Sequence, residues 1–362
     1  MSRYTAPQGL AVEHRPDGAR SRPFAPSCRS PSSTAPPETS LMHVVVTGAS
    51  GFVGRALCRV LVERGHRVTG IVRRRGAVPA GIDEYVYTGR EFSDIGTHWP
   101  AARGAVDCVV HLAARVHVMN DSASDPDAAF RAMNVDGTLR VAEAAQQHGA
   151  RRVVYVSSIK AVAETDDGQP LREDCPAHPE DPYGRSKRDA EVLLRQFGES
   201  AGVETVIVRP PLVYGPEVRA NFLRMMDAVA RGIPLPLGSI AARRSILYVE
   251  NLADALLQCA SAPRAAGECF HVADDDPPSV TDLLRLVGDA VGKPARLLPV
   301  PAAALHAIGK LTGRGAAVDR LTGSLQLDTS RIKRVLGWQP RYTTREGLEA
   351  TAAWYRSRDI RK

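Results

Sequence analysis

Cysteine occurs only six times in the 362 residues and never in the CxxC spacing typical of zinc and redox sites. The six positions are Cys28, Cys58, Cys108, Cys175, Cys259 and Cys269. Histidines do not gather near them, so the sequence offers neither a zinc site nor a disulfide framework. We expect reduced, buried thiols and no bound metal.

Long hydrophobic runs are also missing. No stretch is apolar over the length that a membrane-spanning helix needs, and the first residues contain no signal-peptide core. The net charge is +7, but Lys and Arg are spread along the chain and accompany no nucleic-acid recognition motif. We therefore expect a cytoplasmic protein without a membrane span or a nucleic-acid partner, whose charge suits anionic ligands such as pyrophosphates.

Apolar periodicity is absent from residues 1–41, which are rich in Pro, Ser and Arg. Such a segment cannot bury enough apolar surface to offset the entropy of ordering. The composition predicts a disordered tail. Met42 would also make a natural translation start, so an incorrectly assigned start is the alternative interpretation.

From Met42 onward, apolar strands alternate with amphipathic helices. The expected strands are His43–Thr47, Arg67–Val72, Asp107–Leu112, Arg152–Ser158 and Glu204–Arg209. The expected helices between them are Phe52–Arg64, Ala128–Gln147 and Tyr183–Glu199. This alternation is typical of an α/β fold with a Rossmann-type doubly wound parallel sheet. We assign residues 42–209 to this Rossmann domain.

Pro and Gly become frequent after Arg209, and helices recur at Asn221–Ala230, Val280–Val291 and Arg345–Arg356. We expect residues 210–362 to form mainly a smaller, mostly helical substrate-binding domain, with residues 245–262 returning to the first domain. Ligands of open α/β sheets bind at the carboxyl ends of the strands. The active site should therefore lie between the two parts.

Three glycines in GxxGxxG spacing follow the first strand and open the first helix. Gly48 can make the tight turn, Gly51 lets the backbone approach a pyrophosphate, and Gly54 lets the helix pack on the sheet. The helix N-terminus supplies N–H donors and partial positive charge. The loop residues expected to bind the cofactor are Gly48, Ser50, Gly51, Phe52, Val53 and Gly54.

No acidic residue follows the second strand. In NAD-specific sites, an Asp or Glu at this place commonly binds the ribose hydroxyls. Val72 is followed instead by Arg73-Arg74-Arg75. Arginine forks match a 2′-phosphate, so Arg73 and Arg74 favour NADP over NAD. A solvated basic loop is the alternative explanation.

A YxxxK pattern places Tyr183 and Lys187 on one face of a helix. A nearby ammonium favours the phenolate and lowers the pKa of a tyrosine, so Tyr183 is the expected proton donor and acceptor. Lys187 can also hold the nicotinamide ribose. Ser158, at the end of a strand, can hydrogen-bond the reacting oxygen, although a capping serine is the alternative. Ser157 should point away from the site, because side chains alternate along a strand.

Taken together, these features resemble the extended short-chain dehydrogenase/reductase family, which contains nucleotide-sugar epimerases, dehydratases and reductases. The resemblance runs from about Met42 to Trp354 and includes the segments Thr47–Gly54, His111–Ala114, Asn134–Thr138 and Arg209–Pro216. It implies a catalytic set of Ser158, Tyr183 and Lys187. It further implies that the cofactor site includes Leu112, Ala113, Ala114, Asn134, Lys187, Pro210 and Leu212.

The same resemblance makes Asn221 and Arg244 the candidates for binding the diphosphate of a nucleotide sugar. It also makes a homodimer a possible assembly. More narrowly, the segments His111–Met119 and Ser157–Lys160 are similar to a subgroup that reduces the 4-keto group of a UDP-2-acetamido-2,6-dideoxyhexulose in O-antigen synthesis. The resemblance therefore implies an NAD(P)-dependent nucleotide-sugar reductase.

Three other functions compete with this interpretation. A 4,6-dehydratase is disfavoured, because Ile159-Lys160 stands where such enzymes have an Asp-Glu pair. A UDP-sugar 4-epimerase with retained NAD uses the same Ser, Tyr and Lys and stays open. A non-catalytic, nucleotide-binding regulatory protein with the same fold is the alternative of another class.

Overall fold

The computed structural model describes residues 41–359 apart from 101–103, 117–124 and 314. The predicted disordered tail, residues 1–41, lies outside the described residues except for Leu41, and so does the His117–Met119 part of the resemblance. Within the described part, no helix is long and apolar enough to cross a membrane.

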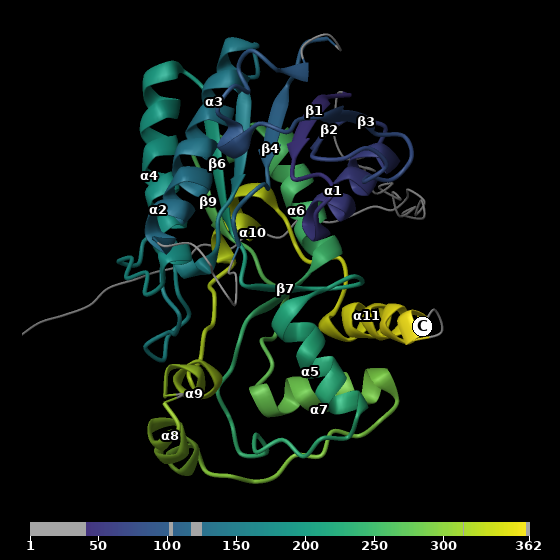
Figure 1. Cartoon of the computed structure of the whole chain (residues 1–362), viewed down its shortest axis with the longest axis vertical. Coiled ribbons are helices and arrows are strands. Elements are labelled where there is room, and N and C mark those ends of the chain that lie inside the picture. Colours follow the sequence, from purple (N-terminus) through teal and green to yellow (C-terminus); the bar gives the residue numbers. More distant parts are fainter. Residues whose placement is uncertain (1–40, 101–103, 117–124, 314, 360–362) are drawn as a thin grey trace, which may run out of the picture. The chain divides into compact units, whose positions relative to one another are not determined.

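Seven parallel strands form the main sheet in the order β3-β2-β1-β4-β5-β6-β9 (Figure 1). Their bounds are β1 His43–Thr47, β2 Arg67–Val72, β3 Asp83–Val86, β4 Cys108–His111, β5 Arg152–Val156, β6 Glu204–Arg209 and β9 Cys269–His271. The order reverses between β1 and β4, where crevices for ligands open in doubly wound sheets. The predicted α/β, Rossmann-type fold is confirmed.

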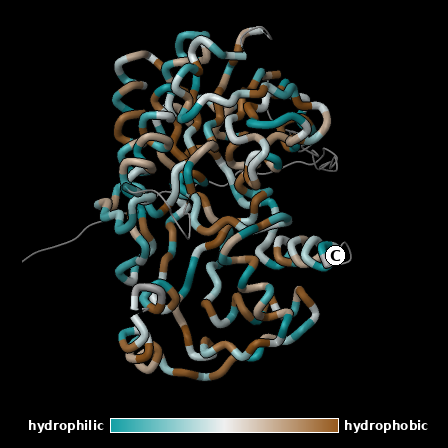
Figure 2. The backbone as a smooth tube through the Cα atoms, viewed as in Figure 1, coloured by the Kyte–Doolittle hydropathy of each residue, from teal (hydrophilic) through white to brown (hydrophobic). Residues whose placement is uncertain are grey.

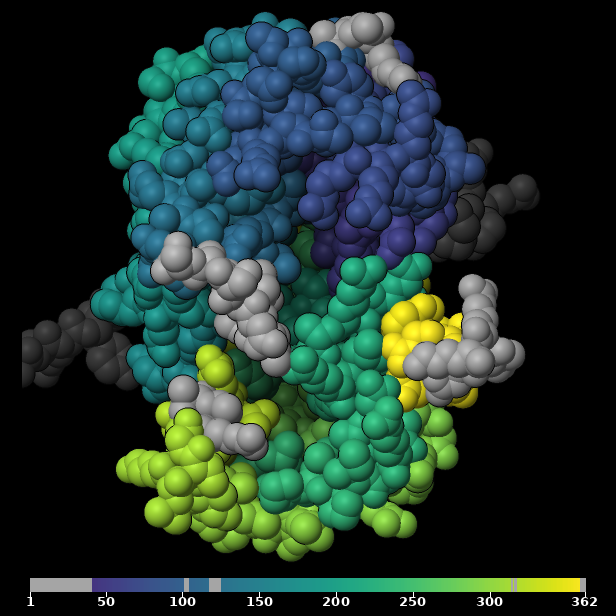
Figure 3. Space-filling model, viewed as in Figure 1, coloured from purple at the N-terminus to yellow at the C-terminus, as the bar shows by residue number. Residues whose placement is uncertain are grey.

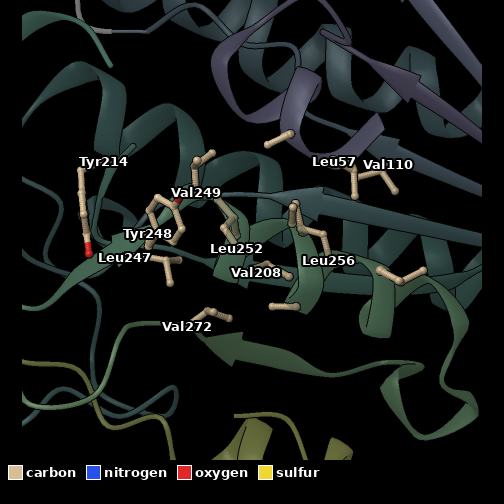
Figure 4. Packing of buried hydrophobic residues seen from close by; sticks show 14 of the residues in the cluster. Leu57, Val110, Val208, Tyr214, Leu247, Tyr248, Val249, Leu252, Leu256 and Val272 are labelled. Carbon is tan, nitrogen blue, oxygen red and sulfur yellow. The ribbon is translucent and has the colours of Figure 1, made fainter. Parts of the chain in front are cut away.

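Helices cover both faces of this sheet. They are α1 Phe52–Glu63, α2 Pro126–Arg131, α3 Gly137–Gln147, α4 Pro182–Ala201 and α6 Val249–Ser261. Alternate residues of each strand serve opposite faces: Val44 packs in one core cluster with α1 and α6, and Val45 in a second with α3 and α4. Figure 4 shows part of the first cluster, and Figure 2 shows hydrophobic residues along the strands. Both faces are buried, which explains the continuous apolar strand sequences.

A buried arginine fastens α6 to the sheet. Arg152 begins β5, and its Nη1 donates to the carbonyl oxygens of Cys259, Ala260 and Ala262 at 2.8–2.9 Å. Its Nε donates to Glu204 at 2.8 Å. The guanidinium thus satisfies carbonyl groups that the end of a helix leaves without partners.

The segment 245–262 divides between two layers. Its strand, β8 Ile246–Tyr248, pairs with β7 Leu212–Tyr214 in a separate two-stranded sheet. The expectation that residues 245–262 return to the first domain is wrong for β8, which stays outside the main sheet, whereas α6 packs against β4 and β5 of that sheet. β9, which follows α6 in the chain, pairs with β6 in parallel and forms the edge of the main sheet.

Helices dominate the remainder of the chain. They are α5 Ala220–Ala230, α7 Val280–Val291, α8 Ala302–Leu311, α9 Gly315–Thr322, α10 Ser330–Leu336 and α11 Thr344–Asp359. α7 packs against α5 and α11, and α8 packs against α9. In Figure 3 a hollow separates the purple and blue segments from the green segments that follow β6.

Candidate active site

The turn between β1 and α1 has the geometry of an anion-binding site. Gly48 has φ +67°, and a Cβ atom there would lie 3.0 Å from the backbone nitrogen of Ala113. A Cβ atom on Gly54 would overlap the Gly48 carbonyl oxygen. α1 begins after Gly51 without a side-chain cap or an acid in its first turn, so its N–H groups and positive end suit a phosphate. These residues fit a dinucleotide cofactor.

A buried pair fixes the neighbouring strand ends. Thr47 Oγ1 lies 2.7 Å from His111 Nδ1 and accepts hydrogen bonds from the backbone N–H groups of Leu112 and Ala113 at 3.2 Å. Burial, together with the Lys187 ammonium, lowers the pKa of His111 to about 3, so the imidazole stays neutral. Leu112 and Ala113 are thereby held against the Gly48 turn. Ala114 follows them and is half-buried.

Asn134 lies in a π-helical turn, Ala132–Asp136, between α2 and α3. Its Oδ1 accepts from the backbone N–H of Arg115 at 2.7 Å, and its Nδ2 donates to Arg115 O and Ser186 Oγ at 3.0 and 2.9 Å. The amide thus joins the loop after β4 to α4. These three protein hydrogen bonds fix the position of the loop after β4 relative to α4.

Tyr183 lies in the first turn of α4. Asp181 caps this helix by accepting a hydrogen bond from Gly184 N at 2.6 Å, and Pro182 occupies the first position. A Cβ atom on Gly184 would overlap the Lys160 carbonyl oxygen, so glycine permits this turn to pack on the segment Ile159–Ala161. The first turn of α4 therefore meets the segment that follows Ser158.

Ser158 lies two residues beyond β5, next to the segment on which the first turn of α4 packs. Its Oγ also accepts from Lys160 N at 3.3 Å, so the capping role and the position beside Tyr183 coexist. Burial raises the pKa of Tyr183 to about 12, and the influence of Ser158 opposes that rise. Ser157 points away, as expected, and donates to Glu191 at 2.6 Å.

Lys187 is buried one turn after Tyr183. Its Nζ donates to Val156 O at 2.8 Å and lies 4.6 Å from the centroid of the Tyr155 ring and 5.9 Å from that of Tyr183. Burial lowers the pKa of Lys187 to about 7, against the opposing charge of Glu191. This differs from the expectation that Lys187 lowers the pKa of Tyr183. Burial dominates both groups and favours their neutral forms.

An ion-pair cluster beside Ser158 was not predicted. Lys160 Nζ lies 2.6 Å from Glu164 and 2.8 Å from Asp181. The Asp181 carboxylate adds to the rise in the pKa of Tyr183, and Lys160 neutralises that carboxylate. The Asp-Pro pair that opens α4 was the available signal for Asp181.

Pro210 and Leu212, which were predicted for the cofactor site, follow β6 directly. Pro210 is buried, and its carbonyl oxygen accepts from Ile159 N at 3.0 Å, which joins this segment to the turn after Ser158. Leu212 is 49% exposed, an apolar side chain available to a ligand. Ser50, Phe52 and Val53 are half-buried at the start of α1.

The two residues proposed for the diphosphate differ in their surroundings. Asn221 is exposed in the first turn of α5. Arg244 is half-buried, and its guanidinium donates to the carbonyl oxygens of Arg320 and Gly323 at 2.6 and 2.8 Å and of Glu164 at 3.3 Å. Arg244 therefore joins α9 to the segment after Ser158.

Arg73 and Arg74 are exposed directly after β2. The next residues form a loop held by Glu84, whose carboxylate accepts from the N–H groups of Gly76, Ala77 and Val78 at 2.8, 2.8 and 3.2 Å. These hydrogen bonds lower the pKa of Glu84. The basic loop is thus anchored on its C-terminal side by a carboxylate.

Metal-ligating clusters of three or more His, Cys, Asp or Glu side chains are absent from the residues that the structure describes. The five described cysteines are free, and burial raises the pKa of Cys58 and Cys108 to about 12. Cys28 lies outside the described residues. Burial thus keeps Cys58 and Cys108 in the thiol form, which is unreactive.

Comparisons with known proteins agree with this geometry. A family model described as "NAD dependent epimerase/dehydratase family" matches residues 44–273. The chain is 38% identical over 313 residues to UDP-glucose 4-epimerase of Vibrio cholerae, covering 85% of this chain and 94% of that protein. It is 30% identical over 322 residues to the 3-diazoavenalumate denitrifying reductase of a Streptomyces species, covering 85% and 99%.

A solved structure of a similar protein has the same fold. The UDP-glucose 4-epimerase of Thermus thermophilus, in complex with NAD, is 25% identical and aligns with a TM-score of 0.70. The alignment covers 87% of this chain and 99% of that structure. The shared architecture thus extends well beyond the nucleotide-binding sheet.

Proposed function

We propose, given that the chain belongs to the NAD dependent epimerase/dehydratase family, that it catalyses hydroxyl–keto chemistry at C4 of a UDP-sugar, as a 4-epimerase in the first instance. The observation that carries the proposal is that the first turn of α4, which contains Tyr183, packs on the segment directly after Ser158, with Lys187 one turn further along α4. This set lies past the carboxyl end of the sheet that also carries the Gly48 turn.

The chain's own residues supply the proton chemistry. When bound, the nicotinamide cofactor supplies a hydride acceptor and donor. Tyr183 takes the proton of the C4 hydroxyl and later returns it, while Ser158 hydrogen-bonds the same oxygen. Lys187 would hold the nicotinamide ribose, and its ammonium, when protonated, would favour loss of the Tyr183 proton.

The relatives support one of the two candidate reactions more strongly than the other. The Vibrio cholerae relative named UDP-glucose 4-epimerase shares 38% identity, which supports epimerisation with a retained cofactor. Reduction of a UDP-4-keto-6-deoxy-HexNAc is the second candidate. Arg73 and Arg74 directly after β2 favour this reductase. Their exposed guanidinium groups suit the 2′-phosphate of NADPH, which a reductase consumes.

One experiment separates these functions. The purified protein is denatured to release any cofactor for mass spectrometry, and is incubated without added cofactor with UDP-glucose, UDP-galactose, UDP-GlcNAc and UDP-GalNAc. A retained NAD and conversion of one sugar to its C4 epimer are expected. Consumption of added NADPH in step with a UDP-4-keto-6-deoxy-HexNAc supports the reductase instead. Cofactor binding without either turnover contradicts the proposal and favours a regulatory protein.

A further inference from the structure

Glu191 lies two turns after Tyr183 and one turn after Lys187, so all three share one face of α4. Its side chain is fully buried, at 0% exposure. A charged carboxylate in such a place is costly unless it is paired and hydrogen-bonded. Its partners therefore indicate why it is there.

Those partners come from each element that carries the candidate site. Ser157, next to Ser158, donates from Oγ to Glu191 Oε1 at 2.6 Å. Arg209, next to Pro210, donates from Nε and Nη2 to the two carboxylate oxygens at 2.9 and 2.6 Å. Arg188, next to Lys187, approaches Oε2 at 3.4 Å.

We propose that Glu191 is a positioning residue, whose buried carboxylate joins the ends of β5 and β6 to α4 and so holds Ser158 and Lys187 in register for catalysis. The inference rests on the proposed function of Ser158, Tyr183 and Lys187. It adds to that function a residue that touches neither substrate nor cofactor. The backbone agrees with such a junction, because Ser157 N donates to Val208 O at 2.8 Å.

The carboxylate also acts through its charge. Its pKa lies below the ordinary value because of the Arg209 and Ser157 hydrogen bonds, so it stays ionised despite burial. Its negative charge opposes the lowering of the Lys187 pKa by burial. The other titratable groups around Lys187 are His111 of β4, Tyr155 of β5 and Tyr183 of α4.

On its other side, the Glu191–Arg209 pair faces β9. The titratable groups there are Cys269 and His271, whose pKa values are shifted to about 11 and about 4 mainly by burial. Both side chains are therefore neutral near pH 7. The negative charge of Glu191 therefore lets Lys187 keep its proton to a higher pH than it would without that charge.

The test separates this role from that of an ordinary structural ion pair. Glu191→Gln/Arg209→Met removes both buried charges together, which proteins often tolerate. Glu199→Gln is the matched control on the exposed side of the same helix. The sequence contains six lysines, so Lys187 can be titrated by NMR of protein labelled with 13C at the lysine Cε.

We expect the double variant to fold and Lys187 to titrate at lower pH than in the unsubstituted protein, because the charge of Glu191 raises its pKa. The alkaline limb of kcat should move down with it, kcat should fall at least tenfold, and KM should change little. Glu199→Gln should leave all of these unchanged. An unshifted Lys187 titration in a folded double variant would overturn the inference.

A second variant tests the inference in case the double variant does not fold. Ser157→Ala removes one hydrogen bond to Glu191 and keeps both charges, and should lower kcat about threefold to tenfold with unchanged cofactor affinity. Unchanged kcat would overturn the positioning of Ser158. The Lys187 titration needs no substrate. A shifted titration in a protein inactive on every UDP-sugar would therefore refute the proposed function while leaving the electrostatic role of Glu191 intact.

Discussion

Lys187 donates a hydrogen bond from Nζ to the carbonyl oxygen of Val156 at 2.8 Å, two residues before Ser158. The bond fixes the ammonium against the end of β5, and burial lowers the pKa of Lys187 to about 7. Small electrostatic changes around this group therefore alter its charge near neutral pH.

The first prediction concerns stability and pH. A lysine whose pKa is about 7 in the folded chain and about 10.4 when unfolded binds fewer protons in the folded state between those values. Stability therefore rises with pH across that window, by up to about 1.4 kcal/mol per unit. Lys187→Met removes this gain. Melting curves from pH 6 to 10 should show the unsubstituted protein gaining stability relative to the variant, and a constant difference would refute the shift.

Lys160 should influence the working pKa of Tyr183. Lys160→Met leaves the Asp181 carboxylate without its ammonium partner, and Asp181 already raises the pKa of Tyr183. The rising limb of kcat in the oxidative direction should move to higher pH. Lys333→Met, which removes a surface partner of Asp275, is the control. Identical pH profiles for the two variants would show that Lys160 has no such influence.

Gly54→Ala should abolish cofactor binding. A Cβ atom there would overlap the Gly48 carbonyl oxygen and crowd Ala49, so the phosphate-binding turn must shift. Gly315→Ala is the matched control, since a Cβ atom there meets nothing within 4 Å. Binding is followed by calorimetry with NAD and NADP. Normal affinity in Gly54→Ala would mean that the cofactor binds elsewhere.

For the reductase candidate, cofactor choice should depend on the exposed arginines after β2. Arg73→Ala/Arg74→Ala removes two guanidinium groups that suit a 2′-phosphate. The affinity for NADPH should fall at least about tenfold, while that for NADH changes little. Arg285→Ala, an exposed arginine on α7, is the control. Tighter binding of NADH than of NADPH by the unsubstituted protein would contradict the assignment of these arginines to a 2′-phosphate and would agree with an epimerase that retains NAD.

Sequence patterns predicted the central strands because those strands are apolar on both faces. β3 was missed because Asp83–Val86 is polar and half-buried at the edge of the sheet, and β7 and β9 because each has only three residues. The Gly48 turn and the Tyr183–Lys187 pair follow from short, local spacings. Glu191 did not, since its partner Arg209 lies 18 residues away and only the sheet brings them together.

The pKa values of Tyr183 and Lys187 could not be predicted from the sequence either. A lysine four residues from a tyrosine suggests a lowered tyrosine pKa, but the degree of burial decides the outcome. In the folded chain, burial raises the pKa of Tyr183 and lowers that of Lys187. Such opposing effects depend on packing that spacing alone does not describe.

The central claim is that Tyr183 transfers the proton. Tyr183→Phe keeps the ring, which packs edge-on against Phe130, and removes only the hydroxyl. Proton transfer of this kind contributes about a hundredfold to ten-thousandfold to the rate. Steady-state turnover of the UDP-sugar that the unsubstituted protein converts should fall at least about a hundredfold, with unchanged cofactor affinity. Near-normal turnover by Tyr183→Phe would contradict the account.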